Sequence, residues 1–280
     1  MTGRLKDFST AVIFCASLML AASAQPALAD DASAWSEDLR SSMRLIAGSA
    51  SNAAFLRAGV EIKMQPGWKT YWRYPGDSGV PPRFDFSASD NVKSAAVQWP
   101  APHRFTDESG TSIGYKENVI FPVHVVPRDS GKPVTLRLKL DYAVCEKLCV
   151  PAQGSAELAF SGSPSTLEKS LTDAEALVPK RVTAAEAQFT AKRVTASPKP
   201  LVYVDLAAPP GVNVEIFAEG PTAEWALPIP NPAQGAPPDR RHFGFELDGL
   251  PPGVDPKGPF ELTFTVVTGG KAAEITTHLD

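Results

Sequence analysis

One run, from Val134 to Val144, constrains the fold more than any other part of the sequence. Its apolar and aromatic residues at every second position (Leu136, Leu138, Leu140, Tyr142 and Val144) alternate with Thr135, Arg137, Lys139, Asp141 and Ala143. Successive side chains of a β-strand point to opposite faces, so the pattern predicts a long strand with one face in a hydrophobic core. The next residue, Cys145, is therefore expected to point away from that core.

Composition extends this prediction to the whole chain. Its 27 prolines and 20 glycines interrupt short alternating apolar runs, which is typical of an all-β protein with many turns rather than of a helical one. A length of 280 residues fits two domains of ordinary size better than one large sandwich. The net charge of -4 gives no indication of nucleic-acid binding.

The N-terminal residues 1–29 have the pattern of a secretory signal peptide. Arg4 and Lys6 precede an apolar run from Ala11 to Ala24, and the small residues Ala27-Leu28-Ala29 provide a cleavage site. The alternative is a transmembrane anchor, but the run is short for a bilayer span and polar residues interrupt it. Cleavage would leave the mature chain outside the cytoplasm, in the periplasm of a bacterium, with no later segment apolar enough to cross a membrane.

Residues 30–162 alternate between strand and turn patterns and predict a first β domain. The pattern then changes over residues 163–180. Ser165 followed by Glu168 has capping-box spacing, apolar residues recur at helical intervals, and Pro179 ends the run. We therefore expect a short helical linker here.

Residues 181–280 predict a second β domain. Its strand candidates are Leu201 to Leu206, Val212 to Ala218, His242 to Leu247 and Phe260 to Val267. Gly269-Gly270 follows the last of them and is a strong signal for a tight hairpin turn. The proline-rich stretch Pro228 to Pro238 is typical of an irregular surface loop.

Cys145 and Cys149 are the only cysteines outside the proposed signal peptide. Four steps of extended strand would separate their Cα atoms by about 13 Å, whereas a disulfide requires roughly 4.4 to 6.8 Å. A bond between them therefore requires Glu146-Lys147-Leu148 to bend back. The pair would then lie at a hairpin tip, with Val150 to Phe160 as the returning strand.

Three uses of this pair remain open on the residues alone. A structural disulfide is the default in a secreted protein, but closing so short a loop contributes only about 2 kcal/mol on the chain-entropy model. A small exposed ring favours redox exchange, since exposed disulfides are the labile ones; Lys147 would favour a thiolate and Glu146 would oppose it. Two thiolates could also hold Cu(I), with Met64 and His103 as loosely placed helpers.

Three motifs carry a resemblance to a known family: GWKTYWRYPGDSGVPP (Gly67–Pro82), QWPAPHRFTDESGTSIGY (Gln98–Tyr115) and DYAVCEKLCVPA (Asp141–Ala152). With them the chain resembles the N-terminal, alpha-type periplasmic domain of the thiol:disulfide interchange protein DsbD over roughly Arg44 to Phe160. It is most similar to the two-domain version in ScsB-like copper-tolerance reductases, which also space their cysteines closely. The C-terminal half looks like the second sandwich of those proteins.

The resemblance implies an all-β protein with two immunoglobulin-like β-sandwich domains and a redox-active disulfide, Cys145 to Cys149, as its only redox group, with no cofactor or metal. It implies a protein-disulfide reductase that takes electrons from a membrane-embedded thiol carrier (DsbD-beta or CcdA-like). The electrons would pass to periplasmic thioredoxin-like or disulfide isomerase proteins, in copper tolerance or cytochrome c biogenesis. No transmembrane or thioredoxin-like sequence follows Asp280, so we expect the membrane partner to be a separate protein.

The resemblance also assigns roles to individual residues. Cys149 would form the mixed disulfide with partners and Cys145 would resolve it. Asp107 and Glu108 fall on an acidic pair in a loop that caps the cysteines; in other proteins such charges are most often solvated.

Further positions near the family's site correspond to Tyr142, Trp72 and Arg73. Ser109-Gly110 stands where DsbD has a shielding aromatic, and Phe105 and Tyr115 are the candidates to replace it. Tyr71, Trp72 and Tyr74 have an alternative interpretation as ordinary sandwich core. For the whole chain, the alternative function is a non-catalytic copper-handling or assembly module whose disulfide is structural.

Overall fold

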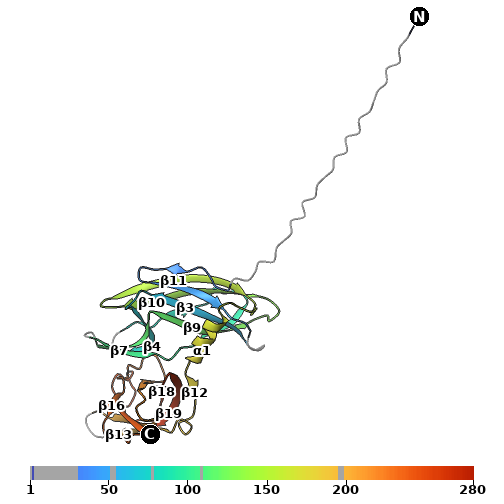
Figure 1. Ribbon diagram of the computed structural model, residues 1–280. Helices are drawn as coiled ribbons and strands as arrows, with labels where there is room; N and C mark the ends of the chain where they lie inside the picture. Colours follow the sequence, from blue (N-terminus) through green and yellow to red (C-terminus); the bar gives the residue numbers. More distant parts are fainter. Residues whose placement is uncertain (1, 3–30, 51–54, 77–78, 108–109, 195–198) are drawn as a thin grey trace.

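The structure is a computed structural model that describes residue 2 and residues 31–50, 55–76, 79–107, 110–194 and 199–280. The proposed signal peptide, apart from residue 2, and the predicted cap residue Glu108 lie outside the described residues. The described part consists of β-strands and one short helix, as the sequence predicts for an all-β protein (Figure 1). No helix in this part has the length and apolar character that a bilayer span requires.

Two sheets form the N-terminal half. Their strands are β1 (Ser36–Glu37), β2 (Ser41–Ala47), β3 (Leu56–Met64), β4 (Lys69–Gly76), β5 (Arg83–Asp85), β6 (Val92–Val97), β7 (His103–Asp107), β8 (Gly110–Lys116), β9 (Asn118–Pro127), β10 (Val134–Cys145) and β11 (Cys149–Phe160). One sheet has the order β1-β2-β3-β9-β6, and the other has the order β11-β10-β4-β8-β7, with β5 also paired to β10. Apolar side chains of both sheets belong to one hydrophobic cluster, so the two sheets form a sandwich, called the first sandwich below.

The hairpin of β10 and β11 confirms the strand prediction. The five apolar residues of the alternating run are all buried in the core of the first sandwich. The two strands pair in antiparallel register from Val134 opposite Phe160 to Cys145 opposite Cys149. The predicted reversal at Glu146-Lys147-Leu148 therefore places the two cysteines directly across from each other.

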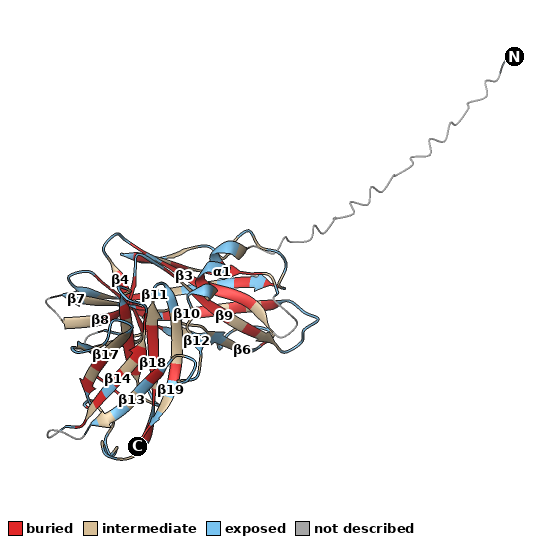
Figure 2. Ribbon diagram, turned by 60° about the horizontal axis from the view of Figure 1, so that its bottom comes forward, coloured by how far each residue is buried: buried red, intermediate tan, exposed pale blue. Residues whose placement is uncertain are grey.

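Two four-stranded sheets form the C-terminal half. Their strands are β12 (Lys180–Arg181), β13 (Phe189–Val194), β14 (Leu201–Ala207), β15 (Val214–Glu219), β16 (Asn231–Ala233), β17 (Arg240–Glu246), β18 (Phe260–Thr268) and β19 (Lys271–Leu279). The orders are β12-β19-β18-β15 and β13-β14-β17-β16. The two sheets share a second hydrophobic cluster and form the second sandwich. Buried positions follow the strands in both halves (Figure 2).

The four strand candidates of this half correspond to β14, β15, β17 and β18. The predicted turn at Gly269-Gly270 joins β18 to β19, and both glycines have a positive φ, 56° and 80°. The sequence prediction missed β13, in which Phe189 is buried and the other five residues are partly buried or exposed. The proline-rich stretch predicted as a loop contains the short strand β16.

The helix α1 (Glu168–Ala176) forms within the predicted linker, but the predicted capping box does not. Leu167 is the N-cap residue and its side chain makes no capping hydrogen bond. Glu168 instead accepts hydrogen bonds from the Ser49 backbone N–H and hydroxyl, both at 2.8 Å, and pairs with the buried Arg57. Arg57 also pairs with Glu175 at 2.6 Å. These contacts fasten α1 to the first sandwich.

The Glu168 contacts predict a sensitivity to acid. The Ser49 backbone hydrogen bond first, and then the Ser49 hydroxyl and Arg57, lower the pKa of Glu168 from 4.5 to about 2. A depressed carboxyl pKa stabilises the fold above its unfolded value and loses that contribution as pH falls toward the folded value. Because this carboxyl is more than a third exposed, we expect a loss of about 1 kcal/mol rather than the full shift. Denaturant unfolding from about pH 5 to about pH 2 should show a steeper loss in the wild type than in Glu168→Gln; equal slopes would contradict the assignment.

Candidate functional site

The disulfide between Cys145 and Cys149 has one buried and one exposed cysteine. The Cα atoms lie 4.1 Å apart at the tip of the β10–β11 hairpin. Cys145 is outside the main core and forms a small cluster with Tyr71 and Ala143, which confirms that it points away from the core. Yet Cys145 is only 2% exposed, while Cys149 is exposed. An approaching thiol therefore meets Cys149.

Tyr71 covers the disulfide. It lies on β4, where Trp72 points into the core of the first sandwich and Tyr71 to the other side. Its hydroxyl oxygen lies 2.7 Å from Cys145 Sγ and 3.1 Å from Cys149 Sγ. Disulfide sulfurs carry no hydrogen, so the hydroxyl donates. Burial, and secondarily the charge of Asp107, raises the pKa of Tyr71 above its ordinary value, which keeps this donor protonated.

Gly79 allows the Tyr71 ring to lie close to the chain. A Cβ atom at this position would come within 2.5 Å of Tyr71 Cδ1 and Cε1. Pro75 packs at the same place, 2.9 Å from that Cβ position. Pro75 and Gly79 of the first motif thus lie against the ring whose hydroxyl contacts the sulfurs.

An ion pair between Lys69 and Asp107 lies close to Tyr71. Lys69 on β4 is opposite Cys145 in the sheet register, and its Nζ lies 2.8 Å from Asp107 Oδ2. The Lys69 side chain is 10% exposed and that of Asp107 41% exposed. Asp107 is at the end of β7, in the hairpin that β7 forms with β8. The structure therefore places the predicted cap residue Asp107 next to the strand that carries Tyr71.

The other predicted site residues lie elsewhere. Trp72, Tyr115 and Tyr142 are in the core of the first sandwich. The Tyr142 hydroxyl pairs with Ser41 Oγ at 2.7 Å. Arg73 extends to the second sandwich, as described below. The sequence analysis did not select Tyr71 as a site residue, although the alternation that places Trp72 inward places Tyr71 on the side of Cys145.

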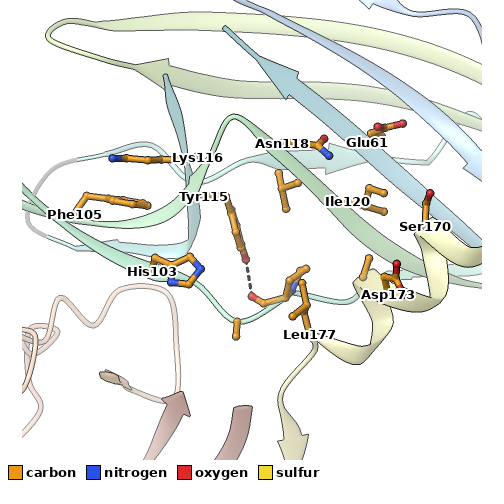
Figure 3. A pocket seen from close by; sticks show the side chains of 14 residues that line it. Glu61, His103, Phe105, Tyr115, Lys116, Asn118, Ile120, Ser170, Asp173 and Leu177 are labelled. Carbon is orange, nitrogen blue, oxygen red and sulfur yellow. Dashed lines mark hydrogen bonds between the residues drawn. The ribbon is translucent and has the colours of Figure 1, made fainter. Parts of the chain in front are cut away.

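The two aromatics proposed as replacement shields occupy other positions. The Tyr115 hydroxyl donates to the Pro100 carbonyl at 2.8 Å, and the Phe105 ring centre lies 5.8 Å from Lys69 Nζ and 5.0 Å from Lys116 Nζ. Both line a pocket of about 580 Å³ that extends to α1 (Figure 3). Neither cysteine lines this pocket. The hydroxyl that lies within hydrogen-bonding distance of both sulfurs belongs to Tyr71.

Within the described ranges, no group of three or more His, Cys, Asp or Glu side chains is arranged to hold a metal ion. The two residues considered as helpers for Cu(I) also lie apart from the sulfurs. Met64 is in the core of the first sandwich, and His103 contacts Glu215 of the second sandwich at 3.4 Å.

Comparisons with known proteins agree with this geometry. Residues 45–161 match the family described as "Thiol:disulfide interchange protein DsbD, N-terminal". The N-terminal periplasmic domain of ScsB from Proteus mirabilis has the same fold, with a TM-score of 0.70 and 20% identity over 89% of this chain and 98% of that one. The CupB6 tip adhesin from Pseudomonas aeruginosa aligns over 90% of this chain and 99% of its own at 11% identity, with a TM-score of 0.19, too low for any argument. None of the curated proteins compared with the chain matches it significantly.

Proposed function

Because residues 45–161 match the family of DsbD N-terminal domains, we propose that this protein is a thiol:disulfide interchange module that reduces disulfides of partner proteins. The observation that carries the proposal is the asymmetry of the disulfide. One sulfur, in Cys149, is open to a partner, and the other, in Cys145, lies buried within bonding distance of it. This arrangement suits a reductase in which Cys149 attacks and Cys145 resolves.

The exchange proceeds in two displacements. In the reduced protein, the Cys149 thiolate attacks a disulfide sulfur of the partner, and the partner's other sulfur leaves as a thiolate. The Cys145 thiolate then attacks Cys149 Sγ, the mixed disulfide breaks, and the partner leaves with both of its sulfurs reduced. Two electrons pass to the partner, two protons follow from solvent, and the Cys145–Cys149 bond forms again. A dithiol donor restores the reduced protein by the reverse sequence.

The Tyr71 hydroxyl has a role in both displacements. A hydrogen bond to the charged form of an acid lowers its pKa, and this donor lies within 3.1 Å of each sulfur. It can therefore stabilise whichever cysteine is the thiolate. Lys69 adds positive charge on the same strand, while Asp107 offsets part of it.

The family and the fold also support a location and partners. The similar ScsB structure is described as a periplasmic domain, and this chain has the signal-peptide pattern over residues 1–29. We place the protein in the periplasm. Its electron donor would be a membrane-embedded thiol carrier and its acceptors periplasmic thioredoxin-like or disulfide isomerase proteins.

Trapping variants test the assignment of the two cysteines. Cys145→Ser lacks the resolving thiol, so we expect it to accumulate mixed disulfides through Cys149 with periplasmic or membrane proteins. These should disappear on treatment with a reducing agent, as seen by non-reducing electrophoresis and mass spectrometry. Cys149→Ser is the matched control and should trap nothing, because Cys145 is buried. The reverse pattern would overturn the roles.

The reduction potential separates this function from a structural disulfide. Equilibration with glutathione or dithiothreitol buffers should give a potential above about -300 mV, the value below which structural disulfides fall. A potential well below that value would favour the alternative of a binding or assembly module.

A further inference from the structure

Strand β4, which carries Tyr71, contacts the second sandwich from Trp72 to Gly76. Directly after Tyr71, the Trp72 ring packs against Phe217 with ring centres 5.7 Å apart. Arg73 pairs with Glu219 and with Glu274, at 2.7 Å each. These contacts, all made by β4, begin one residue from the side chain that touches both sulfurs.

Tyr74 and Gly76 continue this contact at the end of β4. The Tyr74 hydroxyl donates to the Leu227 carbonyl. A Cβ atom at Gly76 would lie 3.4 Å from Ile229 Cδ1, so the backbone of β4 approaches the second sandwich closely. Ile229 is itself part of the core cluster of the first sandwich.

The strand that carries Asp107 is held in the same way. At the start of β7, the Arg104 backbone N–H donates to Glu215 Oε1 at 3.0 Å, and the Arg104 guanidinium donates to the Pro230 carbonyl at 2.9 Å. His103 adds a 3.4 Å contact to Glu215. Thus both β4, which carries Tyr71, and β7, which ends at Asp107, contact the other half of the chain.

One strand of the second sandwich, β15, makes half of these contacts. On β15, Val214, Ile216 and Ala218 point into the core of the second sandwich. The alternate residues Glu215, Phe217 and Glu219 point to β7 and β4 of the first sandwich. Figure 1 shows β4 and β7 on the side of the first sandwich that faces the second. A strand buried on both faces in this way fixes the two halves to each other.

We propose that the second sandwich is a positioning element for the redox site: Glu215, Phe217 and Glu219 of β15 hold β4 and β7, and thereby hold Tyr71 over the Cys145–Cys149 bond. The inference rests on the proposed exchange function and explains how a domain without cysteines takes part in it. Tyr71 and Arg73 lie on one short strand, so removing an ion pair of Arg73 shifts the Tyr71 ring. Arg73 and β15 are positioning groups, since neither touches a sulfur.

The test measures how fast dithiothreitol reduces the disulfide of the full-length chain. A dithiothreitol thiolate attacks Cys149 Sγ and Cys145 leaves as a thiolate; the second dithiothreitol thiol then closes its ring and releases Cys149. The variant Glu215→Ala/Glu219→Ala truncates two of the three residues of β15 that contact the first sandwich. We expect its rate constant to rise about fivefold, because displacement of the Tyr71 ring also opens the buried Cys145 Sγ to attack. The control Glu246→Ala/Glu261→Ala removes the same charge from two exposed positions of the second sandwich and should leave the rate unchanged.

A double-mutant cycle with Tyr71→Ala shows whether the glutamate substitutions change the reduction rate through the Tyr71 ring. If β15 acts by positioning Tyr71, the same pair of glutamate substitutions should change the rate less than about twofold once the ring is absent. Additive effects in the cycle would overturn the proposal, since they would mean that β15 acts by another route. Thermal unfolding of each variant identifies any that do not fold, and Glu219→Gln then replaces the double variant.

Failure of the proposed coupling between β15 and Tyr71 is distinguishable from failure of the proposed exchange function. Equal rates in the wild type and in Glu215→Ala/Glu219→Ala would overturn the coupling, while the trapping variants could still show exchange with partners. An accelerated variant supports the coupling, and an absence of any trapped partner would then count against the exchange function alone.

Discussion

Replacing Tyr71 with alanine is expected to accelerate reduction of the disulfide by dithiothreitol about tenfold, because the change also opens the buried Cys145 Sγ to attack, in addition to the already exposed Cys149. Tyr71 is 2% exposed, so the substitution also leaves a cavity and should destabilise the protein by about 3 kcal/mol. Rate constants measured well below the unfolding transition separate the two effects. Tyr71→Phe keeps the ring and removes only the hydroxyl contacts. We expect it to raise the pKa of Cys149, the thiol that attacks partner disulfides, without exposing the Cys145–Cys149 bond.

Tyr142→Ala is the matched control for the loss of a buried tyrosine. Tyr142 is 3% exposed and lies on β10, the same strand as Cys145, but its side chain points into the core of the first sandwich. We expect a comparable loss of stability and no change in the rate of disulfide reduction. Acceleration in both variants would mean that general loosening, not the removal of the cover, controls access to the sulfurs.

Phe217→Ala is expected to destabilise the first sandwich although Phe217 belongs to the second half of the sequence. Its side chain is fully buried, in the hydrophobic cluster of the first sandwich and against Trp72. Truncating a buried phenylalanine costs about 3 to 5 kcal/mol. Hydrogen exchange followed by mass spectrometry should therefore show the largest loss of protection in β4 and its neighbours as well as in β15.

Phe264→Ala is the corresponding control in the other core. Phe264 is also fully buried, but it belongs to the hydrophobic cluster of the second sandwich. We expect a loss of stability of similar size. The strands that lose the most protection from hydrogen exchange should then be those of the second sandwich. If the two variants gave the same exchange pattern, the halves would unfold as one unit and Phe217 would have no special link to the first.

Local patterns were sufficient to predict the hairpin at the site. The alternation along β10 assigned Leu138 and Tyr142 to the core and Cys145 to the opposite face, and bond geometry required the chain to reverse between the cysteines. These are properties of neighbouring residues in one strand, so they need no knowledge of the rest of the fold. The helix was predicted for a similar reason, since Leu171 and Ala174 are both buried on one side of it.

The N-terminus of that helix shows a limit of prediction from local sequence patterns. Glu168 has the spacing for a bond to Ser165, but Arg57 and Ser49, more than 100 residues earlier in the chain, offer it stronger partners. A charged group pairs with the partners that the tertiary structure brings to it, and a spacing rule does not include them. The same limit applies to Arg73, whose partners Glu219 and Glu274 come from the second sandwich.

By itself, the sequence determined the all-β character, the strand carrying the cysteines, the reversal between them and the family motifs, because alternation and turn residues act between near neighbours. Only the tertiary structure decided which of the two sulfurs is accessible. The β10-β4-β8 order of the sheet brings Tyr71 over Cys145, and the edge strand β15 holds the strand on which Tyr71 lies. Sheet order and the contact between the two sandwiches depend on the packing of the whole core, so no stretch of neighbouring residues encodes them.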